Sequence, residues 1–236
     1  NANSGKAGGI ISGGTLEIQA GDVKNTSGVV ISRAAQTVQA NSISNTLGQF
    51  NSGASLNVTA YELTNTNGQV TASTTLAGNV AQTVKNDGGV IASNDALVLN
   101  AGTLNNDNGQ VASAKSSADI TSNNAISNLK GQLQAATTLK VTGSGLDNTD
   151  GQANAATVAI DTRNQTLTNT RGELSGADVA IRSGALLNDG AGLIQGNKTL
   201  EIHTNGQTLT NANSGATGGI TSGGTLSIQA GDLINN

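Results

Sequence analysis

The chain has 236 residues, a formal net charge of −4, 32 glycines and a single histidine, and it has no cysteine, proline, methionine or tryptophan. Without cysteine, the sequence excludes a disulfide framework, a thiol nucleophile and a cysteine metal site. The acidic balance and the dispersed basic residues disfavour nucleic acid as a partner. No apolar stretch approaches the roughly 18 residues of a membrane-spanning helix, so we expect no membrane insertion by this segment.

An asparagine recurs at nearly constant spacing along the sequence. Successive members are 19 to 24 residues apart, so one unit of about 20 residues is written out eleven times. A short fixed period of this kind is typical of solenoid proteins, in which each unit forms one coil. The column starts at Asn1 and continues with Asn25, Asn45, Asn65, Asn86, Asn106, Asn128, Asn148, Asn169, Asn188, Asn211 and Asn235.

The residues after each asparagine predict the first strand of a unit. A glycine comes first, a mostly aliphatic residue follows two positions later, and a small residue follows two positions after that, as in Gly28, Val30 and Ser32. Residues two apart in an extended chain point to the same face, so these three belong to the interior. The column of small residues marks a place where the interior of the solenoid is narrow.

The second half of each unit alternates between apolar and polar residues. The pattern of a strand with one buried face appears in residues 16–20, 56–60, 139–141 and 226–230. An aliphatic residue also stands two positions before every asparagine after the first. We therefore predict three short strands per unit, each pairing with its counterpart one unit away.

Two of the units that exceed 20 residues lie in the middle of the chain, and we expect their additional residues at corners, where turns face solvent. For unit 66–86 we place the additional residue around residues 77–79. For unit 107–128 we place the surplus either at residues 114–118 or at residues 122–124.

A second, longer repeat joins the two ends of the sequence. Residues 1–23 match residues 211–233 at 18 of 23 positions, whereas adjacent units share only a pattern. This match indicates duplication of a block of ten coils. We expect residues 1–236 to form a single β-helix segment that is an internal fragment of a much longer chain.

His203 is predicted to point outward and has no second ligand at metal-binding spacing. Polysaccharide lyases and hydrolases need clustered carboxylates, but the acidic residues do not recur at one phase of successive units. We therefore expect no enzyme, catalytic residue, cofactor or metal. The asparagines have two interpretations: exposed amides that bind sugars, or an inward structural ladder in which each amide bonds to the next coil. The invariant aliphatic neighbour favours the ladder.

The whole chain carries a repeated unit, Asn-x-x-Gly-x-Ile-x-Ala/Ser-x-x-x-Leu-x-Ile-x-Ala-x-x-Leu-x-Asn, seen for example in residues 45–65 and 128–148. It resembles the haemagglutinin repeat of filamentous haemagglutinin and its relatives, the two-partner-secretion exoproteins, which include contact-dependent growth inhibition proteins. Phe50, Ala153 and the units around Gly78 and Ala118 depart from the pattern.

The resemblance implies a right-handed parallel β-helix solenoid of about eleven coils, secreted to the cell surface of a Gram-negative bacterium. It also implies export through an outer-membrane two-partner-secretion transporter. The expected role is the structural shaft of a large fibrous adhesin or of a contact-dependent toxin-delivery protein. The parent protein would then bind a receptor on a host cell or a neighbouring bacterium. The alternatives are a carbohydrate-active β-helix enzyme and a directly adhesive, receptor-binding segment.

Overall fold

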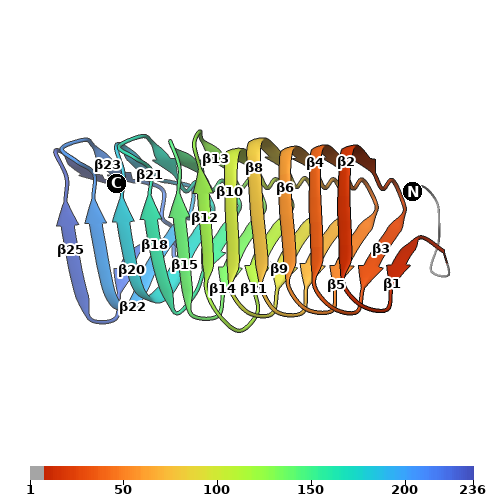
Figure 1. The fold of residues 1–236 in the computed structure, drawn as a ribbon. Coiled ribbons are helices and arrows are strands. Elements are labelled where there is room, and N and C mark those ends of the chain that lie inside the picture. Colours follow the sequence, from red (N-terminus) through yellow and green to blue (C-terminus); the bar gives the residue numbers. More distant parts are fainter. Residues whose placement is uncertain (1–7) are drawn as a thin grey trace.

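The computed structural model describes residues 8–236 as an all-β solenoid whose coils stack along one axis (Figure 1). Its 26 strands belong to one continuous sheet system, and every strand pair is parallel. Each strand pairs with the strand at the same position about 21 residues away. The predicted parallel solenoid of about eleven coils is confirmed. In the described residues, no helix has the length and apolar character to cross a lipid bilayer.

The first strand of each coil is short and lies on one face of the stack. Its register follows the aliphatic column of the sequence, since Val30 lies opposite Phe50 and Phe50 opposite Val70. Ala153 keeps its place in the same column. These strands are β1 (Ile10–Ser12), β3 (Val29–Ser32), β5 (Gln49–Ser52), β7 (Gln69–Ala72), β9 (Val90–Ser93), β11 (Gln110–Ser113), β14 (Gln132–Ala135), β17 (Gln152–Asn154) and β24 (Gly219–Ser222).

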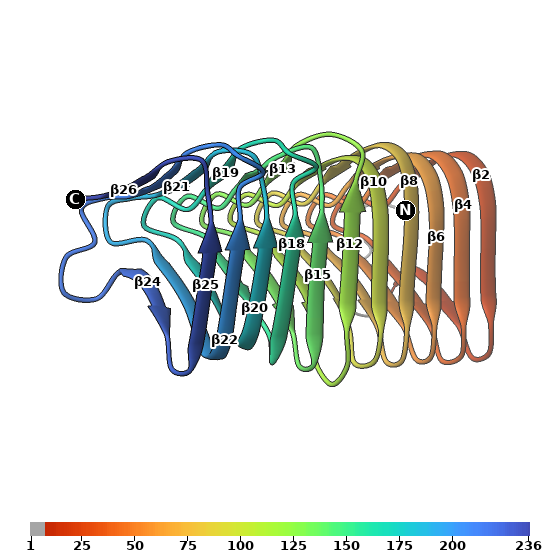
Figure 2. The ribbon, with the colours of Figure 1, turned by 90° about the vertical axis from the view of Figure 1, so that its left-hand side faces the viewer.

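The second and third strands predicted for each coil are one continuous strand in the N-terminal half. These long strands lie side by side in Figure 2 and bend from the second face of the stack to the third. Register partners along them include Leu56 with Leu76 and Leu63 with Val84. The long strands are β2 (Leu16–Lys24), β4 (Gln36–Ser44), β6 (Leu56–Thr64), β8 (Leu76–Lys85) and β10 (Leu97–Asn105).

From residue 118 onward, the second and third faces carry separate strands. The second face has β12 (Ala118–Ser122), β15 (Thr138–Thr142), β18 (Thr157–Asp161) and β25 (Thr225–Gln229). The third face has β13 (Ile126–Ser127), β16 (Leu146–Asp147), β19 (Leu167–Thr168), β21 (Leu186–Asn188), β23 (Leu209–Asn211) and β26 (Leu233–Asn235). In two coils the first and second strands merge instead, as β20 (Glu173–Arg182) and β22 (Leu193–His203). The prediction of three separate strands per coil is therefore correct for only part of the molecule.

The position predicted for the additional residue of unit 66–86 is wrong. Residues 77–79 pair in register with residues 57–59, and the register shifts only after Val80, before Val84 pairs with Leu63. Gly78 thus occupies a core position, opposite Val58. A Cβ atom on Gly78 would lie 2.7 Å from Cδ1 of Leu99, so the leucine of the next coil fills the space that the glycine leaves.

Unit 107–128 carries additional residues at both predicted places rather than at one. Ser113 pairs with Ser93 and Ala118 with Leu97, which leaves one surplus residue between Ser113 and Ala118. Ser122 then pairs with Ala101 and Ile126 with Leu104, which leaves a second surplus residue around residues 123–125. Both lie in corners, where an insertion does not interrupt the pairing of strands.

The core is a narrow column of aliphatic side chains along the axis. The inward residues of successive coils stack on each other, and most are less than 5% exposed, including Leu56, Leu97, Leu139 and Leu200. Burying such side chains is the main favourable contribution to folding. Because each coil buries its residues only against the coils above and below, the stack is held together by interfaces between neighbours.

Candidate functional site

The asparagine column forms a buried ladder at one corner of the solenoid. In the described coils, the side-chain Nδ2 of each asparagine donates to the Oδ1 of the asparagine in the next coil, at 2.7 or 2.8 Å. From Asn25 to Asn188 the members are at most 1% exposed. We call this set the asparagine ladder: Asn25, Asn45, Asn65, Asn86, Asn106, Asn128, Asn148, Asn169, Asn188, Asn211 and Asn235. Asn1 lies outside the described residues.

From Asn45 to Asn169, the amide of each ladder asparagine also donates to two backbone carbonyls. Nδ2 of Asn45 donates to the carbonyl of Gln69 in the next coil at 2.9 Å and to the carbonyl of Gly48 in its own turn at 3.2 Å. The same pair of contacts repeats at Asn106, with the carbonyls of Gln132 and Gly109. A buried carbonyl needs a donor, and this corner leaves the ladder amide to supply it.

The glycine three residues after the ladder asparagine is required by close packing. Its N–H donates to the asparagine carbonyl, as from Gly48 to Asn45 at 3.1 Å, which closes a β-turn. A Cβ atom on Gly48 would lie 2.0 Å from the carbonyl oxygen of Asn25 in the preceding coil. The residue before the glycine adopts a left-handed conformation, with φ of 56° at Leu47. The ladder asparagine, the β-turn that follows it and the glycine that ends the turn therefore form one structural motif that is repeated along the stack.

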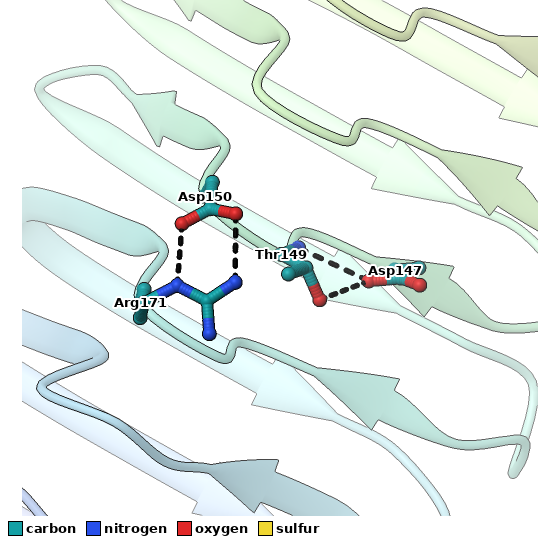
Figure 3. A network of polar contacts seen from close by, with 4 residues as sticks. All are labelled: Asp147, Thr149, Asp150 and Arg171. Carbon is teal, nitrogen blue, oxygen red and sulfur yellow. Dashed lines mark hydrogen bonds and ion pairs between the residues drawn. The ribbon is translucent and has the colours of Figure 1, made fainter.

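Charged residues meet at the same turns in the middle coils. The Arg171 guanidinium donates to both carboxylate oxygens of Asp150 in the preceding coil, at 2.7 and 2.8 Å (Figure 3). Beside this pair, the backbone N–H and the hydroxyl of Thr149 donate to Asp147. The hydrogen bonds from Arg171 hold the pKa of Asp150 below its usual value. A carboxylate with a lowered pKa favours the folded state only while it is ionised. The contribution of the Asp150–Arg171 pair to stability is therefore lost as the pH falls through the lowered pKa of Asp150.

A second group of polar side chains was missed at the level of sequence. Asp161, Arg182 and His203 lie opposite one another on adjacent coils of the second face. The signal lies in the sequence, because each of the three directly follows an inward isoleucine, but it appears only when acidic and basic residues are compared at the same phase. The carboxylate of Asp161 accepts the N–H of Arg163, and Nδ1 of His203 accepts the N–H of Asn205. The row contains one carboxylate, whereas glycoside hydrolysis usually uses two.

The outer surface has a depression beside these residues and a groove on another face. The depression, of about 140 Å³, has Ala159, Ala180, Lys140, Asp161 and Arg182 among its lining residues. The groove, of about 550 Å³, is open and runs across four coils of the third face, lined by residues from Thr103 to Thr168 that are mostly hydroxyl and amide side chains. Within residues 8–236, no three His, Cys, Asp or Glu side chains gather in a metal-binding arrangement.

Comparison of the chain with known protein families, curated proteins and solved structures finds no match.

Proposed function

We propose that this chain is a shaft segment of a large secreted or cell-surface fibrous protein, an adhesin or a contact-dependent toxin-delivery protein of a Gram-negative bacterium. The observation that carries the proposal is the unbroken asparagine ladder, whose hydrogen bonds run from Asn25 to Asn235 in the same register as the aliphatic core. Such a stack is a rod of repeated coils, and its length increases by about 4.8 Å with each coil. A rod of this kind suits a part that holds a binding domain away from the cell.

The resemblance of the repeat unit to haemagglutinin repeats supplies the biological setting of the proposal. In that setting, the parent chain leaves the cell through an outer-membrane two-partner-secretion transporter. A different part of the parent would bind the receptor on a host cell or on a neighbouring bacterium. This segment acts as a spacer, with neither a catalytic step nor a cofactor.

Deletion of residues 25–210 from the parent protein tests the spacer role. The deletion joins Lys24 to Asn211, which are adjacent in phase, and removes nine whole coils. At about 4.8 Å per coil, the fibre is expected to shorten by about 43 Å and still bind its target. Electron microscopy gives the length, and a cell-binding assay gives the adhesion. A shortened fibre that is exported but does not bind would instead assign adhesion to this segment.

The enzyme alternative has its own test, prompted by the depression beside Asp161 and Arg182. The purified segment is incubated with acidic polysaccharides, and new reducing ends or unsaturated products are measured against a boiled control. We expect no turnover. Turnover that disappears in an Asp161→Asn variant would overturn the spacer proposal.

A further inference from the structure

Asparagine is followed directly by glycine at three places in the chain. These dipeptides, at residues 67–68, 108–109 and 205–206, are each followed by glutamine, and residues 66–69 and 204–207 share the tetrapeptide Thr-Asn-Gly-Gln. An asparagine before a glycine can lose ammonia, because the backbone nitrogen of the glycine attacks the side-chain amide carbon and no Cβ atom hinders its approach. By local sequence the three places are nearly equivalent, so differences between them come from the fold.

At the first two places, the glycine nitrogen is held by the turn that follows a ladder asparagine. The N–H of Gly68 donates to the carbonyl of Asn65 at 3.1 Å. In the same way, the N–H of Gly109 donates to the carbonyl of Asn106 at 3.0 Å. Both glycines also lie against the preceding coil, since an added Cβ atom would lie 2.0 or 2.1 Å from a carbonyl oxygen there. The nitrogen is therefore engaged, and it reaches the neighbouring side chain only if the coil opens locally.

Asn205 lies in a turn of a different kind. The N–H of Gln207 closes this turn by donating to the carbonyl of Thr204 at 2.9 Å. Asn205 and Gly206 are the two central residues, with φ of 50° and 77°, so the N–H of Gly206 is not the one that closes the turn. Among the described residues, no group accepts this N–H, and an added Cβ atom on Gly206 would meet nothing within 4 Å. Because Gly206 is also exposed, its nitrogen faces solvent.

The side chain of Asn205 is exposed as well, and in the described part of the chain its amide makes no hydrogen bond. Its backbone N–H donates to Nδ1 of His203 at 3.2 Å. Coils flank this turn on both sides. The N–H of Ser183 in the preceding coil donates to the carbonyl of His203 at 2.9 Å, and the N–H of Thr204 donates to the carbonyl of Gln229 in the following coil at 3.0 Å. The accessibility of Asn205 is therefore a property of this corner.

We propose that Asn205 is a site of spontaneous deamidation and that the fold protects Asn67 and Asn108 from the same reaction. The Gly206 nitrogen gives its proton to hydroxide or a buffer base and bonds to Cγ of Asn205. The Cγ–Nδ2 bond breaks, and the departing nitrogen takes up a proton and leaves as ammonia. Water then opens the resulting succinimide at either carbonyl, which leaves aspartate or isoaspartate at position 205. This change places a negative charge beside His203. It is independent of the shaft role and accumulates with the age of the chain.

Peptide mapping tests this ranking, because trypsin places the three dipeptides in separate peptides, 34–85, 86–115 and 199–236. The folded chain is incubated in mildly alkaline buffer, and mass spectrometry with fragmentation locates the deamidated residue. We expect Asn205 to react at least about tenfold faster than Asn67 or Asn108, a factor that corresponds to about 1.4 kcal/mol in activation free energy. Unfolding in urea should bring the three rates close together. Equal rates in the folded chain, or a difference that persists in urea, would overturn the proposal.

A turn two coils earlier has the same construction as the turn that contains Asn205. Its closing hydrogen bond runs from the N–H of Gln165 to the carbonyl of Thr162 at 3.0 Å. Its central residues, Arg163 and Asn164, have φ of 49° and 62°. The double substitution Arg163→Asn with Asn164→Gly therefore writes Thr-Asn-Gly-Gln into an equivalent turn.

The transplanted asparagine is expected to deamidate as fast as Asn205. The matched control is Arg163→Asn alone, in which the new asparagine precedes a second asparagine whose side chain hinders the attack, and we expect it to react slowly. Circular dichroism confirms that both variants are folded, and the ranking of the three native sites is measured independently of them. A transplanted site that reacts as slowly as Asn67 and Asn108 in a folded chain would overturn the proposal, because the position of the dipeptide within the turn would then not decide its reactivity.

Discussion

At the residue scale, Asn106 shows what one member of the asparagine ladder contributes. It accepts from Asn86 and donates to Asn128 at 2.8 Å, and its amide also holds the carbonyls of Gly109 and Gln132. Asn106→Ala leaves these buried groups without their partner, so we expect a loss of about 1 to 3 kcal/mol in the free energy of unfolding. Denaturant unfolding measures the change.

The control for this prediction is Asn100→Ala. Asn100 donates to Asn79 at 2.8 Å across adjacent coils, in the same kind of bond, but on the exposed surface. There, water replaces the lost partner, and we expect a change below about 0.5 kcal/mol. Equal effects of the two substitutions would indicate that burial of the asparagine ladder has no energetic importance.

Gln36 is the opposite case, a buried amide without a partner. It is fully buried between Leu16 and Leu56, and neither its Oε1 nor its Nε2 has a hydrogen bond. Gln36→Leu restores the aliphatic column, so we expect stabilisation by about 1 to 3 kcal/mol, the usual cost of an unpaired buried amide. Thermal and denaturant unfolding provide the measurement. The exposed Gln39→Leu is the matched control and should be nearly neutral; destabilisation by Gln36→Leu would show that the amide has a partner.

At the scale of elements, the turn after each ladder asparagine depends on glycine for steric reasons. Gly48→Ala would place a methyl group 2.0 Å from the carbonyl oxygen of Asn25. Because the neighbouring backbone cannot move without breaking strand pairing, we expect a loss of about 1 to 3 kcal/mol, as for other overpacked sites. Gly21→Ala, which meets no atom within 4 Å, should have little effect. A similar midpoint for the two variants would mean that the coils move apart easily at this turn.

The sequence predicts the elements well where alternation is regular and poorly where a glycine interrupts it. The columns through Phe50 and Ala153 are in register although both residues depart in size from their neighbours. The unit length instead predicts an additional residue around residues 77–79, yet Gly78 pairs in register with Val58. The reason is a long-range compensation, since Leu99 of the next coil fills the space. A pattern within one unit does not contain that information.

The candidate site also has features that the sequence predicts and features that it does not. The asparagine ladder follows from spacing, because residues at one phase of a solenoid must stack. The row of Asp161, Arg182 and His203 also follows from phase, but only when residues of different charge are compared together. The missing hydrogen bonds of Gln36 could not be predicted, since they depend on which groups the neighbouring coils place around it.

At the scale of the whole molecule, the account states that each coil is stabilised by the coils on either side of it. Leu139 is fully buried in the middle of the stack, with Ala118 and Val158 as its register partners. Leu139→Asp places an uncompensated charge there, which should cost about 3 to 5 kcal/mol. Since neighbouring coils carry the stability, the loss should be concentrated in the middle coils.

Hydrogen exchange of the Leu139→Asp variant, resolved by peptide along the chain, is the most direct test of this central claim. The account predicts that amide protection falls first and most in the coils on either side of residue 139. The coils around Val38 and Ile202 should keep nearly the protection that they have in the unmodified chain. A uniform loss of protection across residues 8–236 would contradict the account, because it would show that the solenoid unfolds as a single cooperative unit rather than as a stack of neighbouring coils.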